Sequence, residues 1–131
     1  MIKLIATDLD GSLLDDNKQL PPDFETVLSQ LKDMGIAFAA VSGRNFDAIH
    51  PTLGDSINTM ICVCNNGANI YEKGVNTVNH PITTDQVHRT LDAIKDMENT
   101  VPLLFTMDKC FGVAGPQGFM EWAQRPYSPL E

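Results

Sequence analysis

The chain has 131 residues, which is enough for one small domain or for one domain and part of another. Its 9 basic and 17 acidic residues give a formal net charge of -8 and a sequence pI near 4.6. This balance leaves no basic stripe for a phosphate backbone, so we expect no nucleic-acid partner. No segment approaches membrane-spanning length, and Asp8 interrupts the N-terminal apolar run, so we expect no membrane partner and a cytoplasmic protein.

The cysteines do not indicate a disulfide framework, because their number is odd. Cys62 and Cys64 have strand spacing, and Cys110 stands apart. No pair of histidines lies near them, so we expect packed, reduced thiols rather than a metal site.

Strand and helix signals alternate along the first part of the chain. Residues 2–8 are an apolar, β-rich run that predicts a buried strand. Residues 21–35 predict a helix, because apolar side chains recur at helical spacing between two prolines and a closing glycine. Residues 36–44 predict a second buried strand that ends in a small polar residue and a glycine.

The next segments continue this alternation. Residues 45–53 predict a short helix that Pro51 disturbs. Residues 58–81 predict a third strand, a glycine-containing connection and hairpin strands. The β-α-β-α-β order implies a parallel sheet with right-handed crossovers, hence an α/β fold.

The pattern changes after Pro81, so we place a domain boundary near residues 80–84. Thr83 or Thr84 is a suitable N-cap for an amphipathic helix. The expected segments are a helix over 83–99, paired strands over 101–108 and 110–115, and a helix over 116–124.

Two carboxylates follow the first predicted strand, in the stretch TDLDGSLLDD at residues 7–16. If the extended conformation persists to residue 10, Asp8 and Asp10 project from one face. Asp8 could act as a nucleophile or metal ligand, and Asp10 could give and take a proton, which together suit covalent phosphoryl transfer. A hard cation such as Mg²⁺ would offset the repulsion of an incoming phosphate. The alternative is a polar strand end at which Gly11 makes a turn.

Polar, glycine-rich sequence follows each of the first three predicted strands: DLDGS, SGR and NNGAN. Ligands of open parallel sheets bind beyond the carboxyl ends of the strands. The coincidence therefore predicts a binding site where these loops meet.

The motifs DLDGSLL, VSGR and NNGANIY, in this order, resemble those of the haloacid dehalogenase-like (HAD) phosphatases, in particular the Cof-type sugar-phosphate phosphatases with an inserted cap. The resemblance extends over essentially the whole chain. It implies a parallel, Rossmann-like core of three α/β/α layers over residues 1–81 and the incomplete beginning of an α+β cap over residues 82–131. It also implies Mg²⁺-dependent hydrolysis of small phosphorylated metabolites, such as sugar phosphates, through an aspartyl-phosphate.

The resemblance implies specific roles for the two acids. Asp8 would be the nucleophile, and its carboxylate would also bind Mg²⁺. Asp10 would be the general acid and base, and its backbone carbonyl would be a second metal ligand.

The resemblance also implies a phosphate-binding group made of neutral donors. The backbone N–H groups of Leu9 and Gly43 and the hydroxyl of Ser42 would hold the phosphoryl oxygens. Ser12 stands where the family usually has threonine, a change that keeps the hydroxyl.

Three further residues have two interpretations each. Arg44 either orients the second loop or approaches the substrate, or it is a surface arginine at a helix start. Asn66 and Gly67 either shape the floor of the pocket near the cap hinge or form an ordinary Asn-Gly turn.

Two family motifs, a lysine and an acidic G-D-x-x-N-D segment, belong downstream of the cap and are not found here. The stretch GDSIN at residues 54–58 lacks the second acid and a preceding apolar strand, so we interpret it as unrelated. We therefore expect an N-terminal half of a phosphatase, with weak Mg²⁺ binding and impaired turnover on its own. Its exposed sheet edge would favour homo-oligomers.

Two alternatives to a phosphatase stay open. The chain could be a truncated, non-catalytic binding or assembly module. A phospho-receiver domain is less favoured, because receivers carry the phosphorylated aspartate after the third strand, where this chain has CNNGAN.

Overall fold

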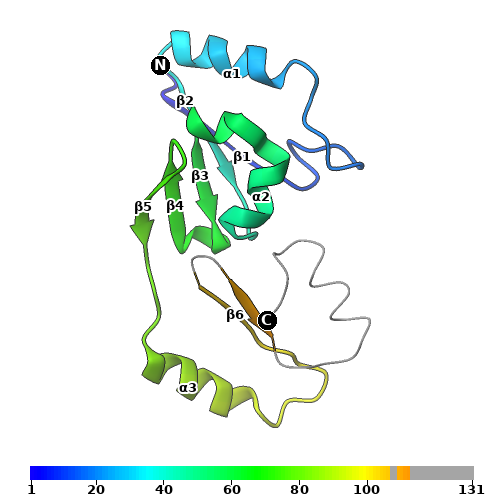
Figure 1. Cartoon of the computed structure of the whole chain (residues 1–131), viewed down its shortest axis with the longest axis vertical. Helices are drawn as coiled ribbons and strands as arrows, with labels where there is room; N and C mark the ends of the chain where they lie inside the picture. The colour runs from blue at the N-terminus through cyan, green and yellow to red at the C-terminus, as the bar shows by residue number, and fades with distance from the viewer. Residues whose placement is uncertain (107–108, 113–131) are drawn as a thin grey trace.

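The computed structural model describes residues 1–106 and 109–112, so the helix predicted over 116–124 lies outside the described residues (Figure 1). The chain alternates strands and helices and then continues into a second, smaller sheet. The strands are β1 (Leu4–Asp8), β2 (Ala37–Val41), β3 (Ile61–Cys64), β4 (Asn69–Glu72), β5 (Val75–Asn79), β6 (Leu103–Phe105) and β7 (Cys110–Gly112). The α-helices are α1 (Phe24–Asp33), α2 (Phe46–Leu53) and α3 (Thr84–Ile94), and the 3-10 helices are η1 (Gly54–Asn58) and η2 (Asn65–Gly67).

A five-stranded sheet in the order β1-β2-β3-β4-β5 forms the body of the molecule. Strands β1, β2 and β3 are parallel, which confirms the predicted parallel sheet, and β4 and β5 add an antiparallel hairpin. The register pairs Asp8 with Val41 and Val41 with Val63. The carboxyl ends of the three parallel strands therefore lie side by side, where the polar loops follow them.

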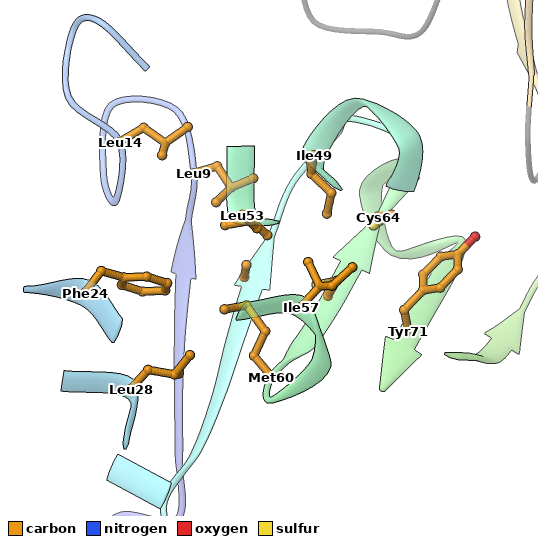
Figure 2. Close-up of a cluster of buried hydrophobic side chains, with 12 residues drawn as sticks. Leu9, Leu14, Phe24, Leu28, Ile49, Leu53, Ile57, Met60, Cys64 and Tyr71 are labelled. Atoms are coloured by element: carbon orange, nitrogen blue, oxygen red, sulfur yellow. The ribbon is translucent and has the colours of Figure 1, made fainter. Parts of the chain in front are cut away.

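The hydrophobic core lies between one face of this sheet and the helices α1 and α2 (Figure 2). Ala40, Cys62 and Tyr71 belong to the sheet side of the core, and Leu28 and Ile49 belong to the helix side. The alternate residues of these strands point to the opposite face, which neither α1 nor α2 covers. That second face is also apolar; its side chains include Ala6, Ala39, Val41, Ile61, Val63 and Ile70.

Helix α1 confirms the helix predicted over 21–35 in a shorter form. It begins after the prolines, with Asp23 as its N-cap residue, and it packs Phe24 edge-on against Phe38 at a ring-centroid distance of 5.7 Å. Gly35 follows its end at φ 69°, a left-handed conformation that glycine adopts without a steric cost.

Helix α2 differs from its prediction, because it continues through Pro51. Proline removes one backbone hydrogen bond from a helix, but the buried side chains of Ile49 and Leu53 flank this position, at 0% and 1% exposure. Burial of these two side chains offsets the lost bond, and the helix ends only at Gly54.

Beyond β5 the chain leaves the large sheet and forms α3 and the small β6-β7 sheet, as Figure 1 shows. Thr83 is the N-cap of α3 and shares a capping box with Gln86, which confirms the predicted helix start. The antiparallel pairing of β6 with β7 confirms the predicted strand pair. The domain boundary near residues 80–84 stays a prediction. Within the described part of the chain, no helix is long and apolar enough to cross a membrane.

The three cysteines are buried and free. Burial raises the pKa of Cys62 to about 11 and that of Cys64 to about 12. These thiols therefore stay protonated at neutral pH and contribute to packing rather than to chemistry.

Candidate active site

A shallow hollow of about 430 Å³ lies at the carboxyl ends of β1 and β2. Its walls come from the end of β1, the loop after β2 and the loop after β3. The lining residues are Ala6, Thr7, Asp8, Val41, Ser42, Gly43 and Asn66. The structure thus brings together the loops that the sequence analysis singled out.

Strand β1 ends at Asp8, so the extended conformation does not reach residue 10 and the assumption that strand alternation aligns the two acids is wrong. Leu9 is fully buried, and its carbonyl accepts a hydrogen bond from the Leu14 amide at 2.9 Å. Gly11 adopts φ 76° in the turn that results. Figure 2 shows Leu9 just beyond the end of β1, beside Leu53. The turn, rather than the strand, therefore determines where Asp10 lies.

Asp8 is exposed at the rim of the hollow. The backbone N–H of Leu9 donates a hydrogen bond of 2.8 Å to the Oδ1 atom of Asp8. The carboxylate is thereby oriented by a donor that the sequence analysis assigned to phosphate binding. The Leu9 amide points toward the Asp8 carboxylate, and its dipole favours negative charge there.

The loop after β2 is held by bonds to the neighbouring strand and loop. The Ser42 amide donates to the Val63 carbonyl at 2.8 Å, and the Asn66 amide donates to the Ser42 carbonyl at 3.3 Å. A Cβ on Gly43 would lie 3.0 Å from Oδ1 of Asn66, so this glycine permits close packing of the two loops. Asn66 itself is left-handed at φ 55° and lines the hollow. Its role in the floor of a binding pocket stays a prediction.

Two cations contact Asp10. Arg44 Nη2 lies 2.6 Å from its Oδ1 atom, and Lys18 Nζ lies 2.9 Å from the same oxygen. Burial raises the pKa of the Asp10 carboxyl, but the hydrogen bond from Lys18 and the charge of Arg44 outweigh burial, so its pKa lies below the ordinary value. Arg44 is mostly buried, which excludes the interpretation as a surface arginine.

The start of α2 supports the loop that carries Arg44. Asn45 is completely buried and caps α2 by accepting a hydrogen bond from the Ala48 amide at 3.1 Å. The next residue, Phe46, stacks on Tyr71 of β4 with a centroid distance of 3.9 Å. Arg44 therefore emerges from a fixed helix start.

The structure does not bring every predicted residue to the hollow: its lining does not include Leu9, Asp10, Ser12, Arg44 or Gly67. Ser12 is exposed and lies in the turn after β1, where it borders a different depression. Gly67 is left-handed at φ 95° behind Asn66, and it does not line the hollow. The stretch GDSIN forms η1 before β3, at the opposite end of that strand from the site. The sequence analysis did not identify Lys18 as a site residue, because nothing in the sequence indicates that the turn after β1 brings its side chain into contact with Asp10.

Comparison with known proteins agrees with this geometry. A family model described as haloacid dehalogenase-like hydrolase matches residues 5–120. The chain belongs to the haloacid dehalogenase-like hydrolases. The HAD fold class predicted from the sequence is thereby confirmed.

Two curated proteins of Escherichia coli (strain K12) are similar to this HAD chain. Pyridoxal phosphate phosphatase YbhA is 34% identical over 76 residues, which are 58% of this chain and 28% of that protein. The 5-amino-6-(5-phospho-D-ribitylamino)uracil phosphatase YbjI is 31% identical over 85 residues, or 64% of this chain and 31% of that protein.

Solved HAD structures share the fold. SMU.1108c from Streptococcus mutans UA159 superposes with a TM-score of 0.90 at 22% identity, covering 99% of this chain and 51% of that one. The HAD subclass IIB sugar phosphatase BT4131 superposes with a TM-score of 0.71 at 17% identity, covering 98% of this chain and 52% of that one. The chain therefore spans about half the length of these structures and, in its matches, under a third of the curated relatives.

The donor set of the HAD site suits a hard cation. Asp8 offers a carboxylate oxygen, and the ligand that the family resemblance implies for Asp10 is its backbone carbonyl, because the Asp10 carboxylate is paired with Lys18 and Arg44. Mg²⁺ commonly takes one or two carboxylates together with waters and substrate phosphate. Among residues 1–106 and 109–112, no group of three or more His, Cys, Asp or Glu side chains is gathered for a metal. The described residues that would hold Mg²⁺ are Asp8 and Asp10, and they do not form a closed metal cage.

We predict that Arg44→Met raises the pKa of Asp10. The pKa of Asp10 is lower in the folded state than its unfolded value of about 4. The ion pair therefore stabilises the fold at pH values above about 4, and this stabilisation is lost as the pH falls through the lower folded-state pKa. An NMR titration of the Asp10 carboxyl should therefore shift to higher pH in the variant. Arg89→Met removes an exposed pair at 3.7 Å and should leave this titration unchanged. An unaltered Asp10 pKa in Arg44→Met would refute the pairing.

Proposed function

We propose that the protein carrying this chain is a Mg²⁺-dependent phosphomonoester hydrolase that acts through an aspartyl-phosphate on Asp8. One observation carries the proposal: an exposed nucleophilic carboxylate shares a hollow with Ser42, Gly43 and Asn66, whose polar groups suit a phosphoryl group. The family membership of the chain supports the same chemistry.

The first step is an attack of an Asp8 carboxylate oxygen on phosphorus. The P–O bond to the substrate alcohol breaks, and the leaving oxygen takes a proton from Asp10. The amide of Gly43 and the hydroxyl of Ser42 hold the phosphoryl oxygens, and the Leu9 amide would join them by exchanging its hydrogen bond to Oδ1 of Asp8 for one to the substrate. A phosphate dianion beside Asp10 favours its protonated form by repulsion, which counteracts Arg44.

The second step is hydrolysis of the acyl phosphate. Asp10, now ionised, takes a proton from a water molecule that attacks phosphorus, and the bond to Asp8 breaks to release phosphate. The contacts of Arg44 and Lys18 favour this ionised form. When bound at Asp8 and Asp10, Mg²⁺ supplies charge neutralisation for the attack of one anion on another.

The substrate we propose is a small phosphorylated metabolite, with sugar phosphates as one class. The relatives' names support small organic phosphates more broadly: one names pyridoxal phosphate, another a phosphoribitylaminouracil, and a structural neighbour is a sugar phosphatase. We infer that residues 1–81 are the core and that residues 82–131 begin the cap. We further infer that the protein is cytoplasmic and that it binds neither nucleic acid nor membranes.

A second candidate is assembly with another copy of the chain. Strand β1 is the edge of the five-stranded sheet in the described residues, and the apolar sheet face opposite α1 and α2 adjoins it. Such surfaces favour association. Size-exclusion chromatography with light scattering should then give a mass above that of one 14.4 kDa chain.

The proposed function is tested by hydrolysis of p-nitrophenyl phosphate by the full-length protein that carries this chain. We expect turnover with Mg²⁺, loss of turnover with excess EDTA, and recovery when Mg²⁺ is restored. The 131-residue chain alone should show a far lower rate. A full-length protein that is folded but inactive on phosphomonoesters with Mg²⁺ would overturn the proposal.

A further inference from the structure

We infer that Lys18 is a positioning residue that fixes the Asp10 carboxyl for its part in the reaction; this inference rests on the proposed function. Asp10 lies beyond the end of β1, and its side chain is 36% exposed. A carboxyl in such a turn would sample several rotamers unless neighbouring groups hold it.

The contact geometry places Asp10 between two cations from different segments. Lys18 and Arg44 approach the same Oδ1 atom, at 2.9 and 2.6 Å, from the loop after β1 and the loop after β2. These two contacts leave Oδ2 as the oxygen available for proton transfer. A single cation could pivot with the carboxyl, whereas two cations from separate loops restrict its rotation.

The loop that carries Lys18 is ordered by its own hydrogen bonds. Oδ1 of Asp15 accepts bonds from the amides of Asn17 at 2.9 Å and Gln19 at 2.7 Å, on either side of Lys18. The Lys18 amide donates to the Asp15 carbonyl at 3.0 Å, and the Asp15 amide donates to the Gln19 carbonyl at 3.1 Å. The turn is therefore closed around Lys18 rather than free to swing.

The backbone of Lys18 is also held in an unusual conformation, with φ 62°. A residue with a Cβ rarely adopts this region, because its side chain is sterically strained there. Here the bonds of Asp15 hold the conformation, and the side chain that results reaches Asp10. The Lys18 side chain is 54% exposed, so its removal should not disturb the core.

The kinetic test compares Lys18→Met with Lys18→Arg in the full-length protein, using p-nitrophenyl phosphate. We expect Lys18→Met to lower kcat about fivefold with little change in KM, as the loss of a partly exposed ion pair predicts. Lys18→Arg keeps the charge and should restore most of kcat. Lys73 is a matched control, because it is also an exposed lysine in a turn, at φ 51°, and Lys73→Met should behave as wild type.

A second readout needs no turnover. Three-bond couplings of the Asp10 β-protons report its χ1 rotamer in the full-length protein by NMR. We expect one dominant rotamer in the wild type and in Lys18→Arg, and averaging in Lys18→Met.

The two readouts separate the possible failures. A rise in KM without a fall in kcat would show that Lys18 binds the substrate and would overturn the inference. An Asp10 rotamer that is unchanged in Lys18→Met would overturn it as well, whatever the kinetics. If the wild type hydrolyses no phosphomonoester, the proposed function fails, and the couplings still decide whether Lys18 positions Asp10.

Discussion

Asp8→Asn should abolish phosphomonoester hydrolysis by the full-length protein, with a loss of at least about a thousandfold in kcat. The amide keeps the shape of the side chain and can still accept the hydrogen bond from the Leu9 amide. It lacks the negative charge, so it neither attacks phosphorus nor attracts Mg²⁺. The measurement is the steady-state rate with p-nitrophenyl phosphate, together with circular dichroism to verify folding.

A matched control shows whether activity depends on the charge of Asp8 itself or only on the net charge of the chain. Asp33 is an exposed aspartate in the last turn of α1, which precedes β2, so it lies at the opposite end of that strand from the hollow. Asp33→Asn changes the net charge equally and should leave the rate within about twofold of wild type. Substantial activity in Asp8→Asn would mean that another residue is the nucleophile.

Leu9→Ala should lower the free energy of unfolding by about 2–5 kcal/mol, the range for deleting a buried leucine side chain. Leu9 is fully buried and lies between Asp8 and Asp10, so its side chain holds this part of the chain against the core. A cavity there should loosen both acids, so we expect kcat to fall as well. Urea unfolding followed by circular dichroism gives the free energy.

Leu9→Met provides the comparison, because methionine has nearly the same volume. It should cost less than about 1.5 kcal/mol and keep most of the activity. If Leu9→Ala were as stable as Leu9→Met, the buried side chain would not be what holds the turn.

Much of the fold could be predicted, because its elements obey local rules. The apolar runs form β1, β2 and β3. Thr83, one of the two predicted N-cap residues, caps α3. The meeting of the three loops followed from parallel strand order, since parallel strands end at one edge of a sheet. The hollow that contains Asp8, Ser42 and Asn66 lies at that edge.

The remaining features depend on tertiary contacts that no local pattern contains. Burial of Leu9 ends β1 at Asp8, so strand periodicity gave the wrong basis for placing Asp10. Helix α2 continues past Pro51, because the side chains of Ile49 and Leu53 are buried on either side of it. The missing N–H of proline, considered alone, predicts that the helix ends there. The contact of Lys18 with Asp10 requires a left-handed backbone at a lysine, which propensity disfavours.

The arrangement of charge explains why an acidic chain could handle an anionic substrate. Arg44 and Lys18 are paired with Asp10, and the groups of the hollow around Asp8 are neutral amides, hydroxyls and apolar side chains. Attraction for a phosphoryl group then depends on aligned neutral dipoles and on a cation that binds with the substrate. The acids at the sheet edge are thus compatible with phosphate once that cation is present.

Trapping of the covalent intermediate tests the central claim most directly. The full-length protein is mixed with substrate and Mg²⁺, quenched in acid and digested, and the peptide that contains Asp8 is analysed by mass spectrometry. The account predicts the added mass of one phosphoryl group on Asp8, lost on treatment with hydroxylamine and absent from Asp8→Asn. A phosphoryl group on another residue, or turnover with no phosphorylated Asp8 at any quench time, would contradict it.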